Sequence, residues 1–231
     1  HQKRGEEGKA EMRVLLDEAA EEPAASEKDL STMASIYERI GSPEKSKALK
    51  DKLLAKYPKG IQARQSRIQA ASAEANLVKR EELLDAIAKD FPPQNDEDKN
   101  LIGNQYSSLA NQYAGQKNWD KFTSLAGKIP PSQRASLYNN VAWSLAENNE
   151  DLDRARNLSA QATEWAKMEK TVPSGSKPAF MTRNDWEQNR AYTYAMYADS
   201  YAFILDKTGD PQTAAKYQAE VVEINHGGNA E

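Results

Sequence analysis

The chain of 231 residues has no cysteine and only two histidines, His1 and His226. Without cysteine it can form no disulfide, no thiolate metal site and no dithiol redox centre. Two histidines, one of them at the first position, do not support a histidine-based catalytic dyad or a multi-histidine metal site. We therefore expect no catalytic residue, no metal and no cofactor in this segment.

Long apolar runs and a one-sided charge are also missing. The formal net charge is −4, from 31 basic and 35 acidic residues, and no basic stripe with interleaved aromatic side chains occurs. No apolar run approaches the roughly 20 residues that a membrane-spanning helix needs. The sequence therefore predicts neither nucleic-acid binding nor membrane insertion. The first eight residues lack the apolar core of a signal peptide, and they leave export open.

Apolar residues at helical spacing are abundant. Leu30, Met33, Ala34 and Tyr37 recur at i, i+3, i+4 and i+7, and Ser26 is a suitable N-cap before them. Turns rich in glycine and proline separate similar segments, and no strand-like alternation is present. The pattern predicts helices at 6–21, 26–40, 44–56, 61–76, 79–90, 101–114, 119–129, 133–147, 152–167, 184–206 and 211–224.

Small residues occupy corresponding places in the resulting helix hairpins. In tetratricopeptide (TPR) repeats, small residues stand near positions 8 and 20, where the two helices approach most closely. If Gly209 is position 15, Ala202 falls at position 8 and Ala214 at position 20. The other hairpins place at these two positions Ala34 and Ser46, Ala110 and Phe122, and Ala142 and Ala155, the last with one extra turn residue. We expect an all-α, right-handed α-solenoid of about five to six TPR-like helix hairpins.

The sequence favours a single TPR-like repeat domain over 1–231. Its expected parts are an N-terminal helix (1–25), helix hairpins (26–168), an irregular connector (169–187), a C-terminal hairpin (188–225) and a tail (226–231). The connector is expected because Pro173, Gly175 and Pro178 interrupt the helical pattern.

An aromatic cluster marks the helix before Gly209. Tyr194, Tyr197 and Tyr201 share one helix side, and Phe203 follows them. This cluster is either a docking face for a peptide or domain, or packing between hairpins. Asp199 stands among the aromatics. We interpret it as a partly buried carboxylate that is hydrogen-bonded to a tyrosine or to Arg190, and not as a catalytic residue.

A second candidate surface involves Trp143 and the polar residues at comparable helix positions. Trp143 follows the position-8 alanine and would face the concave side, unless it is wedged between adjacent repeats. Asparagine side chains can grip a peptide backbone. The residues we expect to bind a protein or peptide partner are Asn104, Ser107, Asn111, Asn139, Trp143, Tyr197, Asp199 and Phe203.

Acidic pairs offer a weaker alternative, either a divalent cation site or glycosidase carboxylates. They occur at Glu21-Glu22, Glu81-Glu82 and Glu150-Asp151, and 95–98 resembles part of a calcium loop. These carboxylates stand at helix starts and turns, where the helix dipole favours them. We therefore interpret them as structural or solvated.

Three stretches resemble a known family: 139–146 (Asn-Asn-Val-Ala-Trp-Ser-Leu-Ala) with 152–162, 179–190, and 197–205 with the following Gly209-Asp210. They are similar to the helical, TPR-like N-terminal region of exported thioredoxin-fold proteins of the TlpA/redoxin type found in Bacteroidetes. Ser200 departs from the threonine usual in that family.

The resemblance implies a role without chemistry in this segment. In that family a thioredoxin module with a Trp-Cys-Gly-Pro-Cys motif follows the helical region, and this cysteine-free chain carries none of those redox residues. The implied function is the non-catalytic interaction scaffold of an exported thiol–disulfide oxidoreductase in the periplasm or cell envelope. Its partner could be its own C-terminal thioredoxin module. The alternative is a stand-alone TPR adaptor that binds peptides or proteins.

Overall fold

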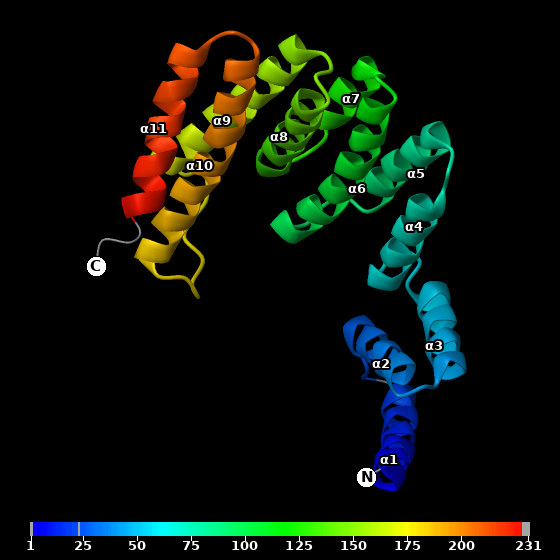
Figure 1. The fold of residues 1–231 in the computed structure, drawn as a ribbon. Coiled ribbons are helices and arrows are strands. Elements are labelled where there is room, and N and C mark those ends of the chain that lie inside the picture. Colours follow the sequence, from blue (N-terminus) through cyan, green and yellow to red (C-terminus); the bar gives the residue numbers. More distant parts are fainter. Residues whose placement is uncertain (1, 23, 228–231) are drawn as a thin grey trace. The chain divides into compact units, whose positions relative to one another are not determined.

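The computed structural model describes residues 2–22 and 24–227, with only the backbone for 2–4, 226 and 227. Within this range the chain forms eleven helices and no strand, so the predicted fold class, an all-α solenoid of about five to six hairpins, is confirmed (Figure 1). None of the described helices is long and apolar enough to cross a membrane. The helices are α1 (Gln2–Glu21), α2 (Glu27–Arg39), α3 (Pro43–Lys56), α4 (Ile61–Ala73), α5 (Leu77–Asp90), α6 (Asp96–Gly115), α7 (Trp119–Ala126), α8 (Pro131–Glu147), α9 (Leu152–Thr171), α10 (Arg183–Lys207) and α11 (Pro211–Gly227).

The helices divide into two compact units, His1–Gln94 and Asn95–Glu231, where the sequence suggested one continuous domain. The boundary falls between α5 and α6. The acidic residues after it begin α6, because the Asn95 side chain accepts a hydrogen bond from the Asp98 amide at 2.8 Å and caps the helix.

The first unit contains α1 and the hairpins α2–α3 and α4–α5. Ser26 and Asp29 form a reciprocal capping box at the start of α2, which fixes where that helix begins. Leu30, Tyr37 and Leu53 are buried in a core to which α1, α2 and α3 contribute. The apolar residues that predicted a helix after Ser26 therefore lie on the side of α2 that faces this core.

The second unit contains the hairpins α6–α7, α8–α9 and α10–α11. Each hairpin packs on the next, because α8 contacts α6 and α10 contacts both α8 and α9. Figure 1 shows these helices following one another in chain order. Side chains of α8, α9, α10 and α11 share one buried cluster, in which alanines lie against Tyr194 and Tyr197.

Four of the five hairpins close with the same turn. Each turn has a left-handed residue at the same place: Gly41 (φ 75°), Lys117 (φ 57°), Asn149 (φ 52°) and Gly209 (φ 82°). In the α8–α9 turn Asp151 is left-handed as well (φ 36°). In each turn the amide after the shared left-handed residue donates to the carbonyl oxygen five residues earlier, at 2.8 or 2.9 Å. This is the hydrogen-bond pattern of a Schellman motif. The α4–α5 hairpin instead turns through Glu74 and Asn76 in extended conformations.

The turn places a buried alanine seven residues before each of the four shared left-handed residues. These are Ala34, Ala110, Ala142 and Ala202, none more than 4% exposed. The predicted small positions are therefore confirmed as buried. In the α6–α7 turn, however, Lys117 and not Gly115 takes the left-handed conformation.

The connector between α9 and α10 is shorter than expected. Helix α9 continues to Thr171 and α10 begins at Arg183, so the irregular segment covers 172–182 instead of 169–187. Thr182 caps α10 by accepting a hydrogen bond from the Asp185 amide at 3.1 Å. This Thr-x-x-Asp pattern is a helix-start signal that the interpretation from proline and glycine overlooked.

Candidate partner-binding face

The first helices of the three hairpins in the second unit share a surface. Helices α6, α8 and α10 contact one another in chain order. The surface formed by the exposed and half-buried side chains of these helices is here called the A-face, and it includes Asn104, Ser107, Asn111, Trp143, Asp199 and Phe203. Six of the eight residues predicted to bind a partner are at least partly exposed on these helices.

The α6 part of the A-face is polar. Asn104, Ser107 and Asn111 recur at i, i+3 and i+7, so they share one side of the helix. Asn104 and Asn111 are exposed, and Ser107 is half-buried. The Asn104 side-chain oxygen accepts a hydrogen bond from Gln133 Nε2 of α8 at 2.9 Å. Asn104 is thus held by the next hairpin, whereas the Asn111 amide has no hydrogen-bond partner among the described residues.

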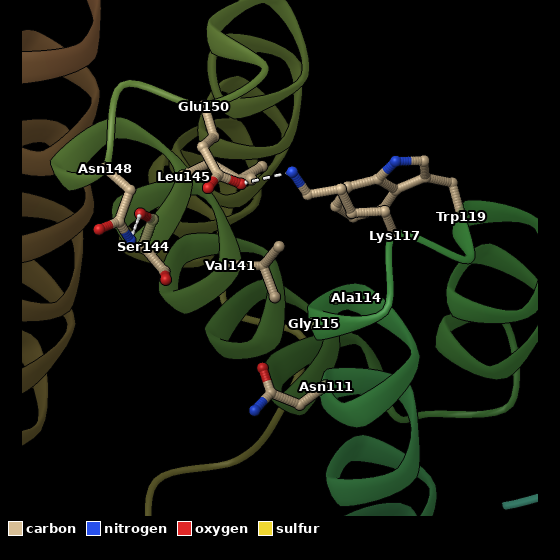
Figure 2. A pocket seen from close by; sticks show the side chains of 10 residues that line it. All are labelled: Asn111, Ala114, Gly115, Lys117, Trp119, Val141, Ser144, Leu145, Asn148 and Glu150. Carbon is tan, nitrogen blue, oxygen red and sulfur yellow. Dashed lines mark hydrogen bonds and ion pairs between the residues drawn. The ribbon is translucent and has the colours of Figure 1, made fainter.

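A hollow of about 200 Å³ lies beside Asn111, between the α6–α7 turn and α8 (Figure 2). Its walls are partly apolar, from Ala114, Val141 and Leu145, and partly polar, from Ser144. The hollow is wide enough for one side chain or several waters. An amide next to an apolar recess can hold an extended peptide by its backbone and one of its side chains.

An ion pair lies at the rim of this hollow. Lys117 Nζ and Glu150 Oε2 are 2.9 Å apart (Figure 2), and this hydrogen bond to Glu150 raises the pKa of Lys117. Sequence reasoning missed Lys117, which follows a helix end, and considered Glu150 only as one of the acidic pairs. The available signal was the spacing, since Lys117 and Asn149 occupy the same place in two like turns.

An aromatic pair lies farther along the A-face. The rings of Trp143 on α8 and Phe203 on α10 are 5.0 Å apart at their centroids and tilted by 37°. Lys207 Nζ lies 5.0 Å above the Phe203 ring and donates a hydrogen bond to the Ala146 carbonyl oxygen at 2.8 Å. Trp143 therefore packs between adjacent hairpins. Phe203 is exposed and Trp143 is half-buried, so part of both rings is accessible at the surface.

Two of the predicted contact residues are not on the surface. Asn139 is 7% exposed and Tyr197 is 5% exposed. Tyr197 is covered because α10 turns this side toward α9, where Thr163 Oγ1 donates to the Tyr197 carbonyl oxygen at 3.1 Å. Burial also raises the pKa of the Tyr197 phenol. The predicted docking face of tyrosines is therefore packing between hairpins, which was the other interpretation of this cluster.

Asp199 differs from expectation in the opposite sense. Its side chain is exposed, not partly buried among aromatics. Arg190, its suggested partner, instead places its guanidinium 3.8 Å from the centroid of the Trp186 ring. Asp199 is thus a surface carboxylate of α10.

The acidic pairs do not gather into a site. Within the described residues, no group of three or more histidine, cysteine, aspartate or glutamate side chains is placed to hold a metal ion. Asp151 accepts a hydrogen bond from the Arg154 amide at 3.3 Å and caps α9. This matches the interpretation of such carboxylates as helix starts.

Comparison with known proteins gives information on the fold. No family model and no curated protein matches the chain. Among solved structures, the crystal structure of BtubC (BKLC) from P. vanneervenii is similar, with a TM-score of 0.50 and 14% sequence identity. The similarity covers 99% of this chain and 91% of that chain. At this sequence identity the similarity shows a shared all-helical fold, and it carries no information about function.

Proposed function

We propose that this chain is a TPR-like interaction scaffold that binds an extended segment of a protein or peptide on the A-face. The observation that carries the proposal is the unpaired Asn111 amide beside a partly apolar hollow, on the surface that also holds Trp143 and Phe203. The scaffold performs no chemical step. It holds its partner in place, and so raises the effective concentration of that partner near other molecules bound to the same scaffold.

The chemistry of the A-face suggests the form of the ligand. The Asn111 amide can donate to a backbone carbonyl and accept from a backbone N–H, so it suits an extended chain of any sequence. The hollow takes one side chain, and the exposed edges of Trp143 and Phe203 take an apolar residue farther along. Such a ligand has two apolar side chains separated by a short polar stretch.

The test is selection of peptides from a random dodecapeptide phage library on the immobilised chain. The affinity of one selected, fluorescein-labelled peptide is then measured by fluorescence anisotropy. We expect Asn111→Ala and Phe203→Ala each to weaken binding about fivefold or more, since a lost hydrogen bond or apolar contact costs on the order of 1 kcal/mol. Asn157→Ala, an exposed asparagine on α9, is the matched control. Equal affinity in all three variants would exclude the A-face as the binding site.

A narrower form of this proposal makes the chain the helical region of an exported TlpA-type thiol–disulfide oxidoreductase, whose thioredoxin module would be the partner. It is supported by the sequence resemblance at 139–146, 179–190 and 197–205. Reading the gene downstream of the codon for Glu231 tests it. A Cys-x-x-Cys module there supports the oxidoreductase, and a stop codon favours the stand-alone adaptor.

A further inference from the structure

The last hairpin carries a groove that no described residue covers. It runs between α10 and α11 and has a volume of about 490 Å³. Its lining residues are Tyr192, Ala195, Met196 and Asp199 of α10, and Gln218, Val221, Val222 and Asn225 of α11. Tyr192, Met196 and Val222 are large and 40%, 55% and 46% exposed. In Figure 1, α10 and α11 are the last pair of the second unit.

The preceding hairpin has the same groove, and there it is filled. Ala202 and Ala214 of the last hairpin correspond to Ala142 and Ala155 of α8–α9. With this alignment, the counterparts of the groove residues are Ser132, Ala135, Ser136 and Asn139 on α8, and Ser159, Ala162, Thr163 and Ala166 on α9. Six of these eight are buried, and α10 packs on both helices. The uncovered groove is therefore a continuation of an interface that this fold already uses.

The two grooves differ in the side chains that line them. Apart from Asn139, the filled groove is lined by alanine, serine and threonine, which leave room for Tyr194 and Tyr197 of α10. The open groove has Val221, Val222 and Met196 at the corresponding places. Met196 and Val221 are larger than Ser136 and Ala162, so they occupy part of the space that the inserted tyrosines fill in the preceding hairpin. It suits a flat, apolar surface like itself.

The lining is also symmetric along the groove. On α10, Ala195 and Met196 lie at the centre, with Tyr192 three residues before them and Asp199 three residues after them. On the antiparallel α11, Val221 and Val222 lie at the centre, with Gln218 and Asn225 at the same spacing. A twofold axis across the middle of both helices would place Asp199 opposite Tyr192, and Gln218 opposite Asn225, of a second copy. A closed twofold dimer requires a surface that is complementary to itself in this way.

We infer that a second copy of this chain covers the groove, with α10 antiparallel on α10 and α11 antiparallel on α11 of the copy. The apolar centres then meet at the axis. Asp199 lies opposite Tyr192 of the second copy, and Gln218 lies opposite Asn225. The Tyr192 hydroxyl accepts a hydrogen bond from Gln188 Nε2 at 3.0 Å, which leaves its own hydrogen to donate to the Asp199 carboxylate. The exposed carboxylate thus gains a donor across the interface.

The first test is the molar mass of the chain in solution by sedimentation equilibrium at micromolar concentrations. We expect a mass near twice 25.7 kDa. The double variant Met196→Glu, Val222→Glu places four carboxylates at the axis and should return the mass to that of one chain. Met168→Glu on α9, at a residue 59% exposed, is the matched control and should stay dimeric. Circular dichroism checks that all variants fold.

The second test uses the absence of cysteine, which makes every introduced thiol unique. Met196→Cys lies at the axis and should form a disulfide with its own copy under mild oxidation. Tyr192→Cys and Asp199→Cys should cross-link when mixed and much less when each is alone. A chain that stays monomeric at about 100 μM would overturn the inference. This is the result expected if a partner protein, and not a second copy, fills the groove. A dimer unaffected by the glutamates, or cross-linked better through Met168→Cys, would overturn it as well.

Discussion

Hairpin α2–α3 of the first unit and hairpin α6–α7 of the second have the same turn but different side chains behind it. Both place an alanine seven residues before the left-handed residue. Five residues after it, α3 has Ser46 and α7 has Phe122, and each is 2% exposed. The Phe122 ring lies 5.8 Å from the rings of Trp119 and Tyr138. One small residue is therefore enough for the helices to meet, and the opposite position can hold a large one.

The largest expected effect is that of removing this large residue. Phe122→Ala leaves a cavity among Trp119, Tyr138 and the α6 helix, because the alanine of α6 cannot fill it. We expect a loss of about 3–5 kcal/mol in the free energy of unfolding, measured by urea denaturation. Phe180→Ala in the connector, where the ring is 88% exposed, should change it by less than about 0.5 kcal/mol. Similar losses in both variants would mean that Phe122 is not a core residue.

The next effect tests the small residue that the two units share. Ala34→Leu in the first unit and Ala202→Leu in the second each force a larger side chain between helices that touch. We expect each to cost about 1–3 kcal/mol of unfolding free energy through overpacking. Ala215→Leu, at an exposed position of α11, is the control. An unchanged melting temperature for either buried variant would contradict the common repeat alignment.

The turn itself gives a smaller effect. Gly41 and Gly209 have φ values of 75° and 82°, and nothing lies within 4 Å of a Cβ added to either. Gly41→Ala and Gly209→Ala therefore meet no neighbour and cost only the strain of a left-handed backbone, about 1–2 kcal/mol each. Gly175→Ala in the connector also meets no neighbour and its φ lies outside the left-handed region. It should therefore leave the unfolding free energy nearly unchanged. A harmless change at Gly41 or Gly209 would show that the turn relaxes.

These turns also show what the sequence can predict of this fold. Helical spacing and glycine turns are local signals, and they predict the hairpins and the buried alanines. Lys117 has no such signal, because lysine rarely adopts a left-handed backbone and only the helices on either side impose it. The boundary at Gln94 has no local signal either, since the sequence predicted the next helix only from residue 101, whereas α6 begins at Asp96.

The candidate site is predictable in part for the same reason. The polar side of α6 follows from spacing alone, so Asn104, Ser107 and Asn111 are found together. The burial of Asn139 and Tyr197 could not be predicted in this way, because it depends on how α10 packs against the hairpin before it. Helix periodicity gives the sides of one helix. It does not say which side the next hairpin covers.

The smallest expected effect compares a tyrosine–carboxylate hydrogen bond in each unit. Tyr37 Oη donates to Asp17 Oδ1 at 2.6 Å, and Tyr194 Oη donates to Glu220 Oε2 at 2.5 Å. In both, burial raises the pKa of the phenol most, and the carboxylate raises it further. An unfolded tyrosine titrates near pH 10. Above that pH the folded state therefore binds more protons than the unfolded state, and the free energy of unfolding falls as the pH rises.

Tyr37→Phe and Tyr194→Phe should each cost about 0.5–1.5 kcal/mol at pH 8, where the hydrogen bond is lost. Between pH 10 and pH 11.5 each variant should lose less stability than the wild type, because one shifted phenol is gone. The measurement is the urea midpoint across this pH range, for both single variants and the double variant. The second unit has two more phenols with raised pKa, Tyr197 and Tyr217, so it should keep the larger alkaline dependence. If the double variant declines as steeply as the wild type, neither hydrogen bond governs the alkaline stability, and the two units do not differ in this respect.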